Sequence, residues 1–161
     1  MSTPRLHRVP FMEAALEEAR LAAAEGEIPV GAVAVHDGRI IARAHNRREQ
    51  AHDACAHAEI LLLREAGAAL GSWRLTEVDV YVTLEPCPMC AAALVHARVR
   101  TLVFGALDPK AGGVRSLFAL CEDPRLNHRL EVVSGICAEK CSEVLQQFFT
   151  RLREARDPGS G

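Results

Sequence analysis

His57-Ala58-Glu59 and Pro86-Cys87-Pro88-Met89-Cys90 are the two stretches from which the fold of this chain can be predicted. One histidine and two cysteines are suitable metal ligands, and zinc held by only three protein groups keeps its fourth tetrahedral position open for water. An open position indicates a catalytic metal rather than a structural one. Residues two apart in a helix point to nearly opposite sides, so Glu59 is not expected to be a fourth ligand. We predict that the histidine and the two cysteines bind the metal and that Glu59 acts on the water.

Both stretches are predicted to begin helices. Helix-forming residues follow Glu59, with Gly67 and Gly71 as possible stop signals, so His57 is expected in the first turn. Pro88 suits the first position of a helix, where its missing N–H is not needed, and small and apolar residues follow it. The two cysteines, three residues apart, would then share one face. Helix N-termini favour thiolates because their unpaired N–H groups stabilise negative charge.

The pair Cys87-x-x-Cys90, taken alone, is a pattern that several kinds of site share. It is typical of a thioredoxin-like redox pair and of half a structural zinc knuckle, as well as of catalytic zinc, and it also arises by coincidence. The preceding His57-Ala58-Glu59 favours catalytic zinc, because both stretches would follow a strand or loop at the same edge of a sheet. The crevice beyond the strand ends is where open α/β sheets bind ligands.

Hydrophobic periodicity along the rest of the chain alternates between strand and helix patterns. Asp37-Gly38 is a strong two-residue hairpin signal between the first two strands. The alternation that follows favours parallel crossovers with helices on both faces, so we predict a three-layer α/β/α domain with a mixed five-stranded sheet. The predicted strands cover 30–36, 39–44, 78–83, 99–104 and 130–133, and the predicted helices cover 10–25, 57–66, 88–95, 116–121 and 138–156, with loops at 46–56 and 107–113.

Length and composition indicate one globular domain, residues 1–161, ending in a flexible tail at 157–161. The 161 residues are 49% hydrophobic, which is enough for a sizeable core. The sequence shows neither an apolar run of about 18 residues nor a secretory signal, so we expect no membrane partner and a cytoplasmic location. The six cysteines are sparse for a disulfide framework, and we expect them to be reduced.

The charge of the chain gives no overall nucleic-acid-binding signature. The net charge is −2, so local clusters must supply any contact with nucleic acid. Arginine provides 17 of the 19 basic residues. Arginine stacks on bases and grips phosphate with paired hydrogen bonds, although genomic coding bias accounts for the preference equally well.

Together the two opening stretches resemble the H-x-E…P-C-x-x-C signature of the zinc-dependent nucleobase and nucleoside deaminases. Over roughly residues 8 to 155 the chain is similar to the bacterial tRNA adenosine deaminases (the TadA type) of the cytidine/deoxycytidylate deaminase superfamily. The similar segments are Pro29-Val30-Gly31-Ala32, Asn46, Tyr81-Val82-Thr83-Leu84-Glu85, Phe104-Gly105-Ala106, Asp108, Asn127-His128-Arg129 and Phe148-Phe149. The resemblance implies a cytidine-deaminase-like fold, one Zn²⁺ per subunit and a homodimer.

The resemblance also implies a reaction, the hydrolytic deamination of adenosine to inosine at the wobble position of a tRNA anticodon stem-loop. Zinc would supply the water nucleophile, and Glu59 would transfer protons to the ring and to the departing amino group. A loop base suits such a pocket because it can be splayed out of its stack. Two alternatives remain: deamination of free guanine, cytosine or cytidine, and a non-catalytic nucleic-acid-binding module with structural zinc, against which Glu59 argues.

Substrate-binding residues are implied in the same way. Asn46 would read the base or sugar through its amide, although an asparagine after a strand usually caps a turn. Neighbours in a helix differ in direction by about 100°, so one of Phe148 and Phe149 should lie near the surface and stack on an unpaired base, with core packing as the alternative. Basic residues would contact phosphate, with a solvated surface role as the alternative. The implied set is Ile28, Val30, Ala32, Asn46, Ala58, Leu84, Glu85, Pro86, Asp108, Lys110, Arg129, Phe148 and Phe149.

Two positions depart from the family pattern. Asp53-Ala54-Cys55 stands where the tRNA deaminases usually have Asp-Pro-Thr, which places a thiol two residues from His57. We expect Cys55 to fill the space of the threonine, with a fourth metal ligand as the alternative. Arg115 stands where the family usually has a small residue, so it should alter the shape of that loop.

Overall fold

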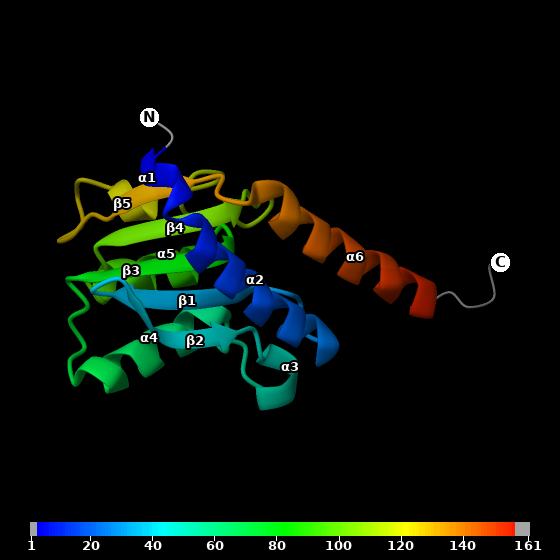
Figure 1. The fold of residues 1–161 in the computed structure, drawn as a ribbon. Coiled ribbons are helices and arrows are strands. Elements are labelled where there is room, and N and C mark those ends of the chain that lie inside the picture. Colours follow the sequence, from blue (N-terminus) through cyan, green and yellow to red (C-terminus); the bar gives the residue numbers. More distant parts are fainter. Residues whose placement is uncertain (1–2, 157–161) are drawn as a thin grey trace.

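The computed structural model describes residues 3–156 (Figure 1), so the predicted flexible tail at 157–161 lies outside the described residues. The helices are α1 (Thr3–Leu6), α2 (Val9–Ala24), α3 (Arg48–Ala51), α4 (Ala58–Leu70), α5 (Pro88–His96) and α6 (Ala138–Arg156), with one 3₁₀ turn, η1 (Leu120–Glu122). The strands are β1 (Gly31–His36), β2 (Arg39–His45), β3 (Val78–Leu84), β4 (Thr101–Ala106) and β5 (Glu131–Ser134). No helix within 3–156 has the length and apolar character that a membrane span needs.

The strands form one mixed sheet in the order β2-β1-β3-β4-β5, which confirms the predicted mixed sheet of five strands. Strand β1 runs antiparallel to both β2 and β3, while β3, β4 and β5 run parallel to one another. Asp37 and Gly38, with φ angles of 51° and 72°, form the predicted tight turn between β1 and β2. Both angles are left-handed, as a type I′ hairpin requires.

Helices cover both faces of the sheet, with α2 and α6 on one face and α4 and α5 on the other (Figure 1). Successive side chains of a strand point to opposite sides, so β1 contributes to both cores. Ala32 and Ala34 pack in the core beneath α4 and α5, whereas Val33 and Val35 pack in the core beneath α2 and α6. The predicted three-layer α/β/α arrangement is thus confirmed.

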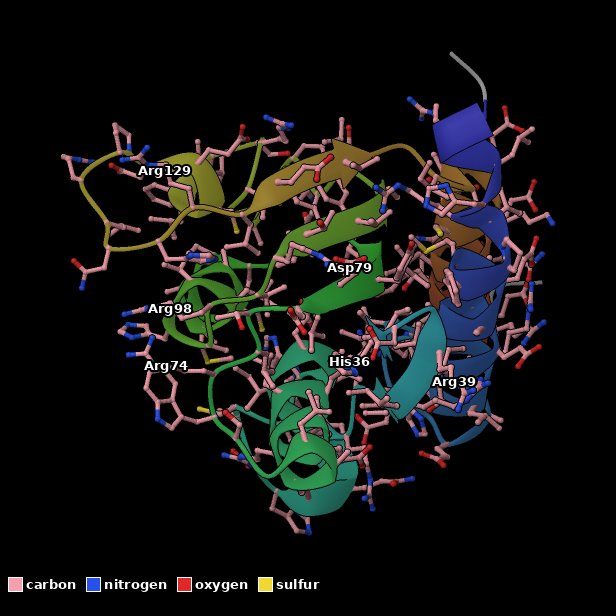
Figure 2. The ribbon with its side chains drawn as sticks, turned by 60° about the vertical axis from the view of Figure 1, so that its left-hand side comes forward. His36, Arg39, Arg74, Asp79, Arg98 and Arg129 are labelled. Atoms are coloured by element: carbon pink, nitrogen blue, oxygen red, sulfur yellow. The ribbon has the colours of Figure 1, made fainter. Side chains whose placement is uncertain are left out.

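The ends of β3 and β4 lie at the same edge of the sheet because these strands are parallel. Strand β3 leads into Cys87 and α5, and β4 leads into the loop that begins at Leu107. The opposite edge holds the starts of the parallel strands and the end of β1, with His36, Arg98 and Arg129 (Figure 2). Residues that follow β3 and β4 are therefore separated from residues that precede these strands by the length of the strands.

Two sequence predictions differ from the structure. The predicted loop at 46–56 contains the short helix α3, and the predicted helix at 116–121 is replaced by turns followed by η1. The chain at 114–116 bends around the carboxylate of Glu85, to which its backbone N–H groups donate. A side-chain acceptor that captures backbone donors in this way competes with regular helical hydrogen bonding.

Candidate active site

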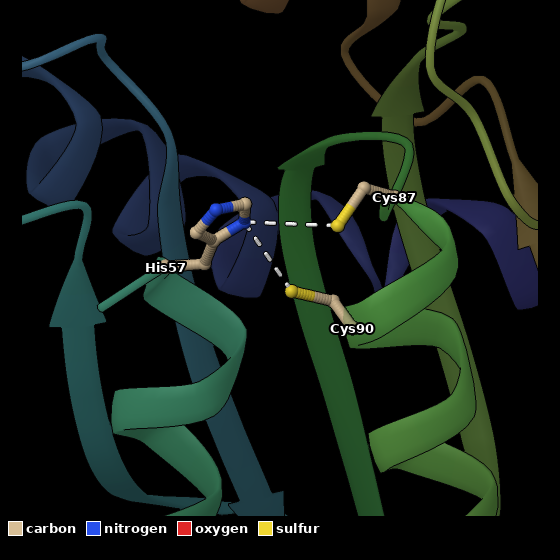
Figure 3. A group of neighbouring side chains, drawn as sticks. All are labelled: His57, Cys87 and Cys90. Atoms are coloured by element: carbon tan, nitrogen blue, oxygen red, sulfur yellow. Dashed lines mark hydrogen bonds between the residues drawn. The ribbon is translucent and has the colours of Figure 1, made fainter. Parts of the chain in front are cut away.

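The predicted metal ligands His57, Cys87 and Cys90 come together in the structure (Figure 3). Nδ1 of His57 lies 3.7 Å from Sγ of Cys87 and 3.5 Å from Sγ of Cys90, and the three atoms lie within 4.8 Å of one another. We call these three residues the ligand cluster. Donors of these types, converging on one point, could hold a zinc ion.

Local backbone geometry shows why the ligands converge. His57 is the N-cap residue of α4, with φ −74° and ψ 151°, and Cys87 is the N-cap residue of α5, with φ −69° and ψ 171°. An N-cap residue has this extended backbone, which usually lets its side chain bond the first turn of the helix. Neither side chain makes that capping bond, so both are free to bind a metal. Figure 3 shows the two helix N-termini on either side of the cluster.

The pKa values of the three residues in the ligand cluster are shifted in different directions. A hydrogen bond with Cys90 lowers the pKa of the Cys87 thiol to about 4, and His57 contributes to the same effect. The same bond raises the pKa of Cys90, and the hydrogen bond with Cys87 raises the pKa of His57. The lowered pKa of Cys87 favours its thiolate, which is the form that binds metals.

Glu59, in the first turn of α4, is nearly buried, with 4% of its surface exposed. Burial raises the pKa of its carboxyl group to about 7. A carboxyl group with this pKa both accepts and releases protons near neutral pH, as general acid–base catalysis requires. Glu59 lines the same cavity as His57 and Cys87 but is not a member of the ligand cluster.

A cavity of about 530 Å³ adjoins the ligand cluster, and its size is typical of small-ligand pockets. Its walls come from the segment before β1, the end of β2, α3, the start of α4, the end of β3, the loop after β4 and α6. Residues of the predicted site that line this cavity are Ile28, Val30, Asn46, His57, Ala58, Glu59, Leu84, Glu85, Cys87, Asp108, Lys110 and Phe149.

Four residues of the predicted substrate-binding set do not line the cavity. Ala32 is fully buried in the core, because its strand position faces α4, and Pro86 is buried without lining the cavity. Phe148 packs edge to face on Phe149, with 5.5 Å between the ring centroids, and only Phe149 faces the cavity. Arg129 precedes β5, which is parallel to β4, so it lies at the opposite edge of the sheet (Figure 2). Ala32 is therefore no wall of the pocket, and the position of Arg129 gives no support to a phosphate contact beside the base.

Four cavity residues were not predicted from the sequence: Arg48, Leu107, Ala111 and Leu145. Leu145 lies four residues before Phe149 in α6, so helical spacing alone would have placed both on one face. Arg48 begins α3, which the sequence pattern indicated as an unstructured loop. Leu107 and Ala111 reach the cavity through the course of an irregular loop, for which periodicity provides no signal.

Asn46 bonds neighbouring backbone groups and also lines the cavity. Its Oδ1 accepts a hydrogen bond from the backbone N–H of Arg48 at 3.3 Å, and its Nδ2 donates to the carbonyl of Ile28 at 3.3 Å. Asn46 is 5% exposed, and it also lines the cavity. A carboxamide has two N–H donors and two acceptor lone pairs, so one of each remains for a substrate.

Glu85 lines the cavity, but its carboxylate is already occupied by protein groups. Burial opposes ionisation, yet the Ser116 hydroxyl and the backbone N–H groups of Asp108, Arg115 and Ser116 lower the pKa of Glu85 to about 2. A carboxylate that accepts several N–H bonds is held in its charged form. Glu85 therefore lines the cavity as predicted, while its carboxylate is held by groups of the protein itself.

The two departures from the family pattern lie outside the ligand cluster. Cys55 is exposed, and its backbone N–H donates to Oδ1 of Asp53 at 2.8 Å. It is not among the described residues that converge on the metal position, which gives no support to a fourth ligand. Arg115 forms a 2.5 Å ion pair with Glu122 and donates to the carbonyl of Val132 at 3.4 Å. It therefore ties its loop to η1 and β5 and does not line the cavity.

Comparisons with protein sequences identify similar deaminases. A family model described as MafB19-like deaminase matches residues 7–153. A Bacillus subtilis protein named tRNA-specific adenosine deaminase is 51% identical over 146 residues, which cover 91% of this chain and 91% of that protein. An Agrobacterium fabrum protein with the same name is 50% identical over 146 residues, which cover 91% of this chain and 96% of that protein.

Comparisons with solved structures agree with those matches. A structure from a study of A-to-I editing by tRNA deaminases at the wobble position of transfer RNA has a TM-score of 0.83 and 50% sequence identity, covering 86% of this chain and 100% of that chain. A guanine deaminase from Nitrosomonas europaea has a TM-score of 0.73 and 26% identity, covering 87% of this chain and 83% of that chain.

Proposed function

This chain belongs to the deaminase family that includes the tRNA-specific adenosine deaminases, and we propose that it converts adenosine to inosine at the wobble position of a tRNA anticodon. The single observation that carries this function is a buried carboxyl group, Glu59, beside three convergent metal donors at one cavity. Water enters the reaction and ammonia leaves, so the C6 amino group of adenine is replaced by oxygen.

One zinc ion per chain fits the donor set of His57, Cys87 and Cys90. When bound, zinc would act as a Lewis acid and would make water a nucleophile at neutral pH. The donor set is also consistent with a catalytic rather than a structural site, because three protein ligands leave one coordination position for solvent. A non-catalytic zinc module would not require a buried carboxyl group beside this open side.

Glu59 carries the proton transfers in this proposal. It accepts a proton from the attacking water and delivers protons to the purine ring and to the amino group that leaves as ammonia. In the metal-free chain, burial raises the pKa of Glu59 to about 7. A nearby dication would favour the charged form, so the pKa of Glu59 should fall when zinc binds.

The walls of the cavity fit a purine base. Ile28, Val30 and Leu84 offer apolar surface, and the amide of Asn46 offers a donor and an acceptor that its protein contacts leave free. Arg48 and Lys110 add positive charge, and Phe149, 38% exposed, offers an aromatic face. These groups could bind the ribose, the phosphates and an unpaired neighbouring base of an RNA loop.

We also propose that the protein acts in the cytoplasm, where tRNA is available, and that it forms a homodimer. Support for a dimer comes from a groove of about 940 Å³ between α4 and α5, whose lining includes Leu63, Trp73 and Ala93. Trp73 is 62% exposed and adds a large aromatic surface to this groove. Light scattering of the purified chain would distinguish a dimer from a monomer.

Ammonia release from a substrate panel tests the function. The panel holds an anticodon stem-loop with adenosine at the wobble position, free adenosine, guanine, cytosine and cytidine. We expect the stem-loop to yield inosine and free adenosine to react barely or not at all, because contacts remote from the reacting atom supply the energy that orients the base. Robust turnover of guanine or cytosine with an inert stem-loop would contradict the tRNA substrate and leave the zinc mechanism intact.

A further inference from the structure

One wall of the cavity is an irregular loop between β4 and η1. Residues 107–119 have neither helical nor strand structure, yet they supply Leu107, Asp108, Lys110 and Ala111 to the cavity. Within the loop, Asp108 accepts hydrogen bonds from the backbone N–H groups of residues 110–112. The N–H groups of Asp108 itself and of residues 114–116 need side-chain acceptors elsewhere in the protein. We call residues 107–119 the β4–η1 loop.

Glu85, directly after β3, supplies these acceptors. Its Oε1 accepts hydrogen bonds from the backbone N–H of Asp108 at 3.0 Å and from the Ser116 hydroxyl at 2.5 Å. Its Oε2 accepts from the backbone N–H groups of Val114, Arg115 and Ser116 at 3.1, 2.7 and 2.9 Å. The side chain is 2% exposed, so these bonds are shielded from water. One buried carboxylate thus joins the two ends of the loop segment that faces the substrate.

Two glycines allow the loop to approach Glu85 so closely. A Cβ atom on Gly112 would overlap the Glu85 carboxylate, and a Cβ atom on Gly113 would lie 2.7 Å from Cα of Pro88. Contacts this short are sterically forbidden. A larger residue at position 112 would displace the Glu85 carboxylate or the loop, and one at position 113 would push the loop away from the start of α5. The backbone N–H of Gly113 also donates to the carbonyl of Pro86 at 2.7 Å. The loop is therefore seated directly on the segment that connects β3 to α5.

We propose that Glu85 is a positioning residue for substrate specificity, which holds the β4–η1 loop so that Asp108 and Lys110 meet the part of the substrate outside the base. Its oxygens already accept five hydrogen bonds from the loop, so it acts through the loop and does not need to touch the substrate. The expected change in KM rests on the proposed function, because it is measured with the RNA substrate. The order of the loop itself is a property of the free protein.

Glu85→Gln tests this role, because the amide keeps the shape of the side chain but replaces one acceptor oxygen with an N–H₂ donor. We expect faster amide hydrogen exchange in the β4–η1 loop of the RNA-free protein, unchanged zinc content, and an about 10-fold higher KM for the stem-loop with a smaller change in kcat. Ser116→Ala removes one of the five bonds and should give the same changes in weaker form. The matched control is Asp79→Asn, which removes the ion pair with Arg100 at the opposite edge of the sheet and should leave loop exchange and KM close to wild type.

Three results would overturn the proposal: unchanged loop exchange in Glu85→Gln, a loss of kcat with constant KM, or a loss of zinc. If Glu85→Gln does not fold, Ser116→Ala and Gly112→Ala address the same bonds, and normal loop exchange in both would contradict the role of Glu85. The exchange experiment needs no RNA. An inert wild-type enzyme with a loosened loop in the variants would therefore disprove the tRNA substrate while retaining the structural role of Glu85.

Discussion

The Nδ1 atom of His45 lies 2.9 Å from Oε1 of Glu18 and joins the end of β2 to α2. On its other side, Nε2 of the same imidazole lies 2.9 Å from Oε2 of Glu25. Burial lowers the pKa of His45, but the hydrogen bonds and charges of the two carboxylates outweigh it, so the pKa is raised overall. The next residue is Asn46, so this charged bridge holds the strand end that carries a cavity residue.

The first prediction concerns pH and this bridge. A histidine whose folded pKa exceeds its unfolded value stabilises the fold fully below about pH 6.5, and the effect is lost as pH rises through the folded pKa. Wild type should therefore exceed His45→Gln in free energy of unfolding by about 1 kcal/mol at about pH 6, and the difference should shrink by about pH 9. Urea unfolding of both proteins across this range measures the difference. A difference that grows with pH would contradict the protonated bridge.

The second prediction separates proton transfer from metal binding. Glu59→Ala should retain zinc but lose activity by at least about 10²- to 10⁴-fold, because it removes the group that transfers the protons. Cys87→Ala should lose zinc as well as activity, because it removes a ligand of the cluster. Elemental analysis of the purified proteins and ammonia release measure the two properties. Equal zinc loss in both variants would show that Glu59 binds the metal.

The third prediction compares the two neighbouring phenylalanines of α6. Phe149 lines the cavity and Phe148 does not, although their rings touch edge to face. Phe149→Ala should raise KM for the stem-loop about 5- to 100-fold, which is the effect expected for the loss of one base–aromatic stacking contact. Phe148→Ala is the matched control and should have a clearly smaller effect on KM. Equal effects in the two variants would mean that packing within α6, rather than stacking on RNA, accounts for the loss.

The fourth prediction concerns salt. Arg48→Ala and Lys110→Ala should each weaken RNA binding and reduce the slope of log affinity against log salt by about 1, because each would remove one phosphate contact of the proposed complex. Arg129→Ala, at the opposite edge of the sheet, is expected to leave the slope unchanged. Filter binding of the stem-loop at several salt concentrations gives these slopes. A reduced slope for Arg129→Ala would show that RNA reaches that edge, as the family resemblance implied.

The fifth prediction concerns the thiol at position 55. Cys55 is exposed and stands apart from the ligand cluster, so Cys55→Thr should change neither zinc content nor turnover. Both are measured with the assays used for Glu59→Ala. Higher activity in Cys55→Thr would instead support a thiol that competes for the metal.

The sequence was sufficient to predict the ligand cluster and the order of the main elements. Spacing is local information: Pro88 fixes the start of α5, and its neighbours Cys87 and Cys90 then share one end of that helix. Alternating and helical hydrophobic patterns likewise indicated the five strands and the helices that cover them. The remaining elements were harder to predict, because α3 and η1 are too short for periodicity to identify them.

Only the tertiary structure decided which residues near these elements reach the cavity. Ala32 and Val30 lie two positions apart, yet only Val30 lines the cavity, because Ala32 continues into the sheet where α4 covers it. Glu85 was predicted as a substrate-binding residue from its place in the sequence, whereas only the structure shows that its oxygens accept bonds from a loop more than twenty residues away. Local spacing determines which donors a helix end can present, whereas the partners of a buried polar group depend on which distant segments the fold brings against it.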